Sequence, residues 1–239
     1  MISIVTALII STALANSQPT GCECPRSIGA AAGAPPLIVT DVLQHHPNLI
    51  ACGYLHARQS QHKVTASEFQ VFRCGTDEPI LTFGALQTCW LESMPSKMKI
   101  TETSRWPFGL NWSWVDVPIW EYMVYADVGR PIEKRMVLSP PILSKRQVED
   151  TLKNYTLLKQ SLASKTNRLA LATELENIIG RILAVALMGN KEGQRDLESM
   201  RSELSLDGHM GEIHSEAVSI YNSYAQETGK LPVLKKQIH

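Results

Sequence analysis

The first half of the chain alternates short apolar runs with polar turns, a pattern that predicts β-strands. The runs are about four to eight residues long, and in several of them apolar residues recur at every second position, which favours strands over helices. The predicted strands cover residues 37–43, 49–57, 64–73, 80–83, 86–91 and 98–103. Several short strands separated by turn residues are typical of a small barrel or sandwich.

An aromatic segment, residues 106–128, follows these strands and holds four of the five tryptophans. From Asn111 the residues alternate, with Trp112 and Trp114 on the same side, so we expect a strand. Pro118 interrupts it, because proline donates no backbone hydrogen bond to a β-ladder. We therefore predict two strands that meet at a bend, the second over residues 119–126.

The spacing changes from strand-like to helical after Pro140 and Pro141. Ser144 and Gln147 have the spacing of a capping box. In such a box the side chain of each residue accepts a hydrogen bond from the backbone N–H of the other. Apolar residues then recur every three or four positions, which predicts helices starting at Ser144 and over 167–188, 195–204 and 210–226. We expect four glycines to mark helix ends: Gly189, Gly193, Gly208 and Gly229.

These patterns together predict the α+β fold class: a small antiparallel, OB-like β-barrel followed by a helical C-terminal region. The helices are expected to bury their apolar faces on the barrel. The predicted organisation is a signal peptide over residues 1–15, a disulfide-containing β-rich domain over 16–140 and a helical region packed on the barrel over 141–239.

The amino-terminal segment has the composition of a secretory leader. Residues 2–14 carry no charge, and Ala13-Leu14-Ala15 supplies the small residues that a signal peptidase accepts before Asn16. The later apolar stretch 169–188 contains three charged residues, so we do not expect it to span a membrane. The sequence thus predicts a secreted or periplasmic protein without a transmembrane anchor after leader cleavage.

All cysteines lie in the first ninety residues: Cys22, Cys24, Cys52, Cys74 and Cys89. Export would place them in an oxidising compartment, where disulfides persist. Five cysteines allow fifteen arrangements of two bridges with one thiol unpaired, and the sequence does not choose among them. Cys22 and Cys24 are too close to pair comfortably with each other, so we expect each to reach a different strand. A zinc site lacks the usual C-x-x-C spacing.

Charge and motifs exclude several functions. The chain has 23 basic and 23 acidic side chains, and no basic face that would indicate nucleic-acid binding. It has neither a G-x-S-x-G elbow nor a phosphate-binding glycine loop. His209, Glu212 and His214 lack zinc-protease spacing, and we interpret both histidines as exposed residues at a helix start. We therefore predict no catalytic residue, no metal and no cofactor.

The aromatic segment has two interpretations. If its rings lie exposed on a sheet, Trp112, Trp114 and Trp120 form a stacking surface for sugars, with Asn111 and Asp116 bonding hydroxyl groups. If they are buried, the same rings form the core where barrel and helices meet. The core interpretation is favoured, because burial of so much aromatic surface needs no ligand to explain it.

Several of these features resemble the netrin-like domain, which is shared by tissue inhibitors of metalloproteinases and by secreted bacterial proteins. The matching segments are Cys22-Glu23-Cys24, the strand 49–57, Phe69-Gln70-Val71-Phe72, Cys89, Tyr122-Met123-Val124-Tyr125-Ala126 and the proline-led helix over 140–155. The resemblance implies an OB-type barrel closed by a helix. In the inhibitors the cysteine at the mature amino terminus chelates the zinc of the target, whereas cleavage after Ala15 would leave six residues before Cys22.

The sequence favours a non-catalytic binding or interaction protein, inhibitor-like in character. Its expected partner is another envelope or extracellular protein. The alternative is a protein that binds glycans or peptidoglycan through the aromatic face, and an enzyme of unrecognised type is a third hypothesis.

Overall fold

A computed structural model describes most of the chain beyond its amino-terminal segment. The described residues are 24, 37–38, 49–58, 63–84, 88–94, 97–127, 129–163 and 172–235. The predicted leader, Cys22 and residues 39–43 lie outside them.

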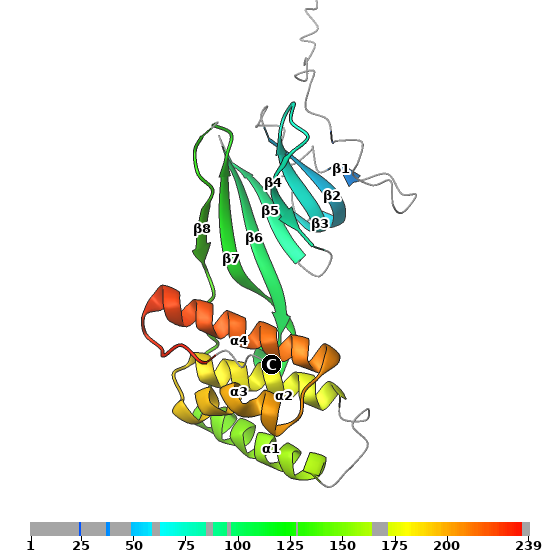
Figure 1. The fold of residues 1–239 in the computed structure, drawn as a ribbon. Coiled ribbons are helices and arrows are strands. Elements are labelled where there is room, and N and C mark those ends of the chain that lie inside the picture. Colours follow the sequence, from blue (N-terminus) through cyan, green and yellow to red (C-terminus); the bar gives the residue numbers. More distant parts are fainter. Residues whose placement is uncertain are drawn as a thin grey trace, which may run out of the picture.

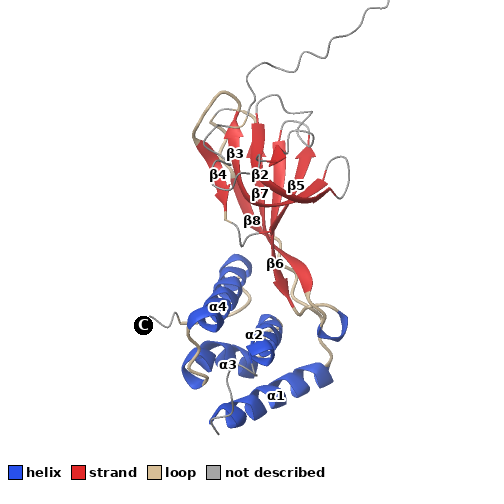
Figure 2. Ribbon diagram, turned by 90° about the vertical axis from the view of Figure 1, so that its right-hand side faces the viewer, coloured by secondary structure: helices blue, strands red, loops and turns tan. Residues whose placement is uncertain are grey.

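Eight described strands form one antiparallel sheet, followed by four helices (Figures 1 and 2). The strands are β1 (Leu37–Ile38), β2 (Leu49–Arg58), β3 (Lys63–Arg73), β4 (Pro79–Phe83), β5 (Thr88–Met94), β6 (Lys97–Trp106), β7 (Val115–Tyr125) and β8 (Glu133–Met136). The helices are α1 (Lys145–Ala163), α2 (Ala172–Leu187), α3 (Lys191–Glu203) and α4 (Gly208–Thr228). The predicted α+β class, a β-sheet followed by a helical region, is confirmed.

One edge of strand β3 pairs with two different strands. Its first half pairs with β5 and its second half with β4, while β2 runs along the other edge. At the change of partner Glu68 has a positive φ of 46°, and its N–H donates to the Gly84 carbonyl at 3.2 Å. The order β1-β2-β3-β5-β6-β7-β8 gives a barrel-like sheet that is not closed, because no described pairing joins β1 to β8.

The aromatic segment does not form the two strands predicted for it. Residues 110–112 form a 3-10 turn, and β7 begins only at Val115. Strand β7 then continues through Pro118, because the pairing shifts by one residue between Glu102 and Thr103 of β6 and leaves Ile119 as a bulge. Such a bulge accommodates a proline, which has no N–H for the ladder. The prediction of a break at Pro118 was therefore wrong, and β8 was not predicted.

The described helices lie close to the predicted ranges, and residues 167–171, the predicted start of α2, lie outside the described residues. The capping box is confirmed, since the backbone N–H groups of Gln147 and Ser144 bond each other's side chains at 3.3 and 3.0 Å. Gly193 does not end a helix: it lies in the first turn of α3, and a Cβ there would lie 2.6 Å from Val185 Cγ1 of α2. It therefore permits close helix packing. Gly208 begins α4. No described helix is long and apolar enough to cross a membrane.

Two hydrophobic cores stabilise the molecule. One fills the curl of the sheet and includes Phe69, Phe72 and Leu91. The other lies among the helices and also contains Trp106, Val117 and Ile119 from the ends of β6 and β7. Figures 1 and 2 show β6 and β7 reaching from the sheet to the helical layer. The helices are thus attached to the sheet through the aromatic segment.

A disulfide ties Cys24, in the amino-terminal part of the chain, to the sheet. Cys24 is bonded to Cys52 of β2, with the two Cα atoms 5.8 Å apart. Cys74, directly after β3, is also disulfide-bonded. Cys89 of β5 is a free, buried thiol, and burial together with the nearby Glu102 carboxylate raises its pKa well above the ordinary range.

Candidate functional site

The turn between β6 and β7 directs two tryptophans towards the helices. The N–H of Gly109 donates to the Ser113 carbonyl at 3.0 Å and closes the turn. Asn111 and Trp112 both have positive φ, 54° and 61°, a conformation that a bulky side chain rarely adopts. This turn breaks the alternation predicted from Asn111, so Trp112 and Trp114 contact α2 instead of lying along one side of a strand.

Trp112 and Trp114 meet two residues of α2 that lie one helical turn apart. The indole N–H of Trp114 donates to Asn177 Oδ1 at 3.1 Å. The amide of Asn177 in turn donates to the Thr173 carbonyl at 2.9 Å, which fixes its orientation. The guanidinium of Arg181 lies 5.3 Å from the centroid of the Trp112 ring, within the range of a cation–π interaction. The two tryptophans therefore hold Asn177 and Arg181 from the sheet side.

The same two residues of α2 line a pocket between α1 and α2. It has a volume of about 350 Å³ and is lined by Asn154, Leu157, Leu158, Ser161, Glu174, Asn177, Ile178 and Arg181. Ligand-binding pockets are commonly of this size or larger, with apolar walls and a few polar groups that orient the ligand. We call Trp112, Trp114, Asn177, Arg181 and Leu157 the Trp–Arg surface.

Arg181 is the most unusual member of this surface. Its side chain is half-buried, and its Nε has no hydrogen-bond partner. The carboxylates in the described part of the chain form no ion pair with it. Burial lowers the pKa of the guanidinium, because removing a charge from water disfavours the charged form. A half-buried cation without a counter-ion is costly to the fold and available to an anion.

The other residues proposed for the aromatic face lie elsewhere. Trp120 is half-buried on β7, and the ammonium of Lys134 from β8 lies 4.0 Å from its ring centroid. Asn111 and Asp116 are exposed. The fold therefore brings Trp112 and Trp114 to α2, while Trp120 contacts β8.

Sequence reasoning did not select Arg181 or Asn177 as functional residues. The available signal was a charged side chain inside the otherwise apolar run of α2, whose remaining members are mostly buried. In the sequence, that charge argued only against a membrane span. Its proximity to Trp112 depends on tertiary structure, because the two residues belong to different halves of the chain.

A second pocket of about 400 Å³ lies between α3 and α4. It is lined by Glu198, Arg201, His214, Ser215, Val218, Ser219, Asn222, Ser223, Gln226 and Lys235. Two of its charged side chains have partners within the chain: Arg201 donates to Ser215 Oγ at 3.2 Å, and Glu198 accepts from the backbone N–H of Lys235 at 3.1 Å.

His214 in this second pocket gives the protein a pH-dependent stability. Our interpretation of it as exposed was wrong: it is 4 % exposed, and its Nε2 donates to the Leu197 carbonyl at 2.8 Å. Burial, with Arg201 nearby, lowers its pKa below the ordinary 6.5. Its contribution is therefore complete above pH 6.5 and declines as the pH falls towards the lowered folded-state pKa, by at most about 1.4 kcal/mol per pH unit.

We expect the free energy of unfolding to fall between pH 7.5 and 5.5, as measured by urea denaturation at each pH. His214→Gln should lose less stability than wild type over the same interval, because glutamine can retain a bond to Leu197 without titrating. An equal decrease in both proteins would assign the pH dependence to other groups.

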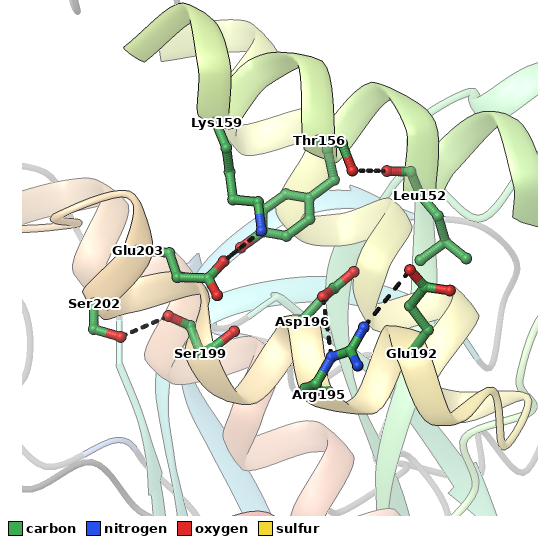
Figure 3. Close-up of polar contacts among 10 residues, drawn as sticks. Leu152, Thr156, Lys159, Glu192, Arg195, Asp196, Ser199, Ser202 and Glu203 are labelled. Atoms are coloured by element: carbon green, nitrogen blue, oxygen red, sulfur yellow. Dashed lines mark hydrogen bonds and ion pairs between the residues drawn. The ribbon is translucent and has the colours of Figure 1, made fainter. Parts of the chain in front are cut away.

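A polar network joins α1 to α3 (Figure 3). The Tyr155 hydroxyl donates to Glu203 Oε2 at 2.7 Å, and Lys159 Nζ lies 2.9 Å from the same oxygen and 4.8 Å from the Tyr155 ring centroid. Burial and the hydrogen bond to Glu203 raise the pKa of Tyr155 well above its ordinary range. Because the three groups satisfy one another, this network stabilises helix packing and leaves no group poised for chemistry.

No three histidine, cysteine, aspartate or glutamate side chains of the described residues gather in a way that could hold a metal ion. Comparison with protein-family models, with curated proteins and with solved structures finds no significant match for this chain. The resemblance to the netrin-like domain stays a prediction.

Proposed function

We propose that this chain is a non-catalytic binding protein that acts in the secreted or periplasmic space and binds another protein through the Trp–Arg surface. The observation that carries this proposal is the half-buried guanidinium of Arg181, which has no counter-ion among the described residues and opens into a pocket. A partner that supplies an anionic group would satisfy it.

The composition of the surface supports a role in protein recognition. Tryptophan and arginine are the residues most enriched among those that dominate binding energy at protein interfaces. Leu157 beside the pocket is 49 % exposed, and Leu110 in the turn that carries Trp112 is 91 % exposed. Apolar side chains next to a half-buried cation would lose water on binding and strengthen the interaction with the anion.

The location is supported by the sequence and the cysteines. The uncharged amino-terminal segment followed by Ala13-Leu14-Ala15 has the form of a cleaved leader. The bridge between Cys24 and Cys52, and the bonding of Cys74, fit an oxidising compartment.

Site-specific photo-crosslinking of the exported protein tests this function. We expect p-benzoylphenylalanine placed at Leu157 to crosslink one extracellular or periplasmic protein, and the same probe at Val233, which is 52 % exposed after α4, to give none of that product. Trp112→Ala should remove the product, since Trp112 positions Arg181. The purified partner should then bind wild type at a 1:1 ratio and bind Trp112→Ala at least tenfold more weakly.

Two results would contradict this function. The first is crosslinking at Val233 equal to that at Leu157. The second is saturable binding of an oligosaccharide or peptidoglycan fragment that Trp112→Ala abolishes while no protein partner binds, which would establish the glycan-binding alternative.

A further inference from the structure

The pocket between α1 and α2 combines a cation with apolar walls. Leu157, Leu158 and Ile178 supply the apolar lining, and Arg181 supplies a charge that forms no ion pair with a described carboxylate. Trp112 lies against one side of the guanidinium, and Asn177 is held by Trp114 and Thr173. The side chains of Arg181 and Asn177 are thus positioned before any ligand binds, which lowers the entropic cost of binding.

We propose that this pocket binds a carboxylate carried on a short apolar group, with Arg181 binding the carboxylate and the leucine and isoleucine side chains contacting the apolar part. The inference rests on the proposed function and specifies its ligand. The planar guanidinium offers parallel N–H donors that match the two oxygens of a carboxylate. Asn154 of α1 provides a further polar side chain in the same pocket.

The second charged residue of the pocket restricts the ligand to a single negative charge. Glu174 lies seven residues before Arg181 on α2, which corresponds to a separation of about 10 Å along the helix axis. Its carboxylate would repel a second anionic group at the far end of the pocket. A monocarboxylate with an apolar body therefore suits this lining better than a phosphate ester or a polyanion.

A carboxylate on a short apolar group can come from two sources: the C-terminal residue of a protein and a free small carboxylic acid. Each presents one carboxylate next to an apolar side chain, and a pocket of about 350 Å³ accommodates either. A C-terminal residue would in addition place the preceding residues against the exposed Leu157.

A matched pair of ligands tests the carboxylate directly. N-acetyl-leucine and N-acetyl-leucinamide differ only in the terminal group, a charged carboxylate in the first and a neutral amide in the second, and Trp112 provides an intrinsic fluorescence signal beside Arg181. We expect saturable binding of N-acetyl-leucine and at least tenfold weaker binding of the amide. Equal affinity for the two ligands, or binding of neither, would overturn the inference.

Substitutions of the arginine separate its role from general stability. Arg181→Met keeps an unbranched apolar side chain as far as the position of Nε and removes the charged guanidinium, and we expect it to weaken N-acetyl-leucine binding at least tenfold. Arg195→Met of α3 is the matched control, because Arg195 is exposed and lies 3.7 Å from Glu192; it should bind normally. Unchanged affinity in Arg181→Met would overturn the inference.

The melting temperature shows whether the arginine serves the fold or the ligand. Arg181→Met should melt at or above the temperature of wild type, since it removes a half-buried charge that has no counter-ion among the described residues. If Arg181→Met fails to fold, the arginine is a structural residue and the inference is wrong. Arg181→Lys keeps the charge but not the parallel donors, and should retain weak binding that still prefers the acid to the amide.

A longer ligand distinguishes the two sources and the two proposals. If acetyl-Ala-Ala-Ala-Leu binds more tightly than N-acetyl-leucine, the ligand is a protein C-terminus; equal affinity indicates a free acid, and both results support the carboxylate site. Loss of crosslinking to the partner in Trp112→Ala without binding of either acid would overturn this inference alone and leave the proposed function intact.

Discussion

Replacing Trp106 with alanine is expected to lower the free energy of unfolding by about 3–5 kcal/mol, the range observed when large aromatic side chains are removed from protein cores. Trp106 ends β6 and is 2 % exposed. It belongs to the helical core although it comes from the sheet. Its removal would therefore leave a cavity at the point where sheet and helices meet.

The packing around Trp106 leaves little room for the cavity to collapse. A Cβ built on Gly180 of α2 would lie 3.2 Å from Trp106 Cε3 and 2.5 Å from Pro107 Cδ, so the helix backbone already touches this segment. The Trp106 ring also stacks on Phe108, with centroids 6.4 Å apart. Because α2 cannot move closer, the lost contacts are not recovered by relaxation.

Urea denaturation followed by circular dichroism measures this effect, with Trp114→Ala as the control. Trp114 is half-buried and makes one hydrogen bond, to Asn177, so its removal should cost about 1–2 kcal/mol. A loss in Trp106→Ala no larger than in Trp114→Ala would show that Trp106 does not anchor the helices to the sheet.

Local signals in the sequence predicted the helical half well. The Ser144 and Gln147 pair set the start of α1, and the positive φ values of Gly189 and Gly229 lie where α2 and α4 end. For α4 the helical spacing was right: Ala217 and Ile220 are buried, and Ile213 and Tyr224 pack against the same core. His214 is buried on this helix as well, and its polar side chain gave no sign of that in the sequence.

The aromatic turn could not be predicted from local pattern. Alternation from Asn111 onward is indistinguishable in the sequence from that of a strand, yet Asn111 and Trp112 adopt positive φ. A tryptophan in this conformation is disfavoured by its own backbone and is held there by contacts with α2. Those contacts join residues 63 positions apart, as the Trp114–Asn177 bond shows. The candidate site therefore depends on tertiary packing, which the local periodicity of the sequence does not reveal.

Removing the bridge between Cys24 and Cys52 is expected to cost about 3–4 kcal/mol. The two cysteines are 28 residues apart in sequence, and a cross-link that closes a loop of this length restricts the unfolded chain by about that free energy. Cys52 is completely buried in the sheet core, so its replacement also removes apolar contacts of β2. The bridge is thus expected to contribute much of the stability of a single domain.

The double variant Cys24→Ala/Cys52→Ala isolates this bridge, because Cys74 remains disulfide-bonded in it. Urea denaturation without reductant should show the full loss in this variant. Cys89→Ala is the control: it removes a buried free thiol, leaves the bridges in place and should cost only about 1 kcal/mol. A variant lacking the bridge that unfolds at the wild-type urea concentration would mean that the sheet fixes its amino-terminal segment without this covalent link.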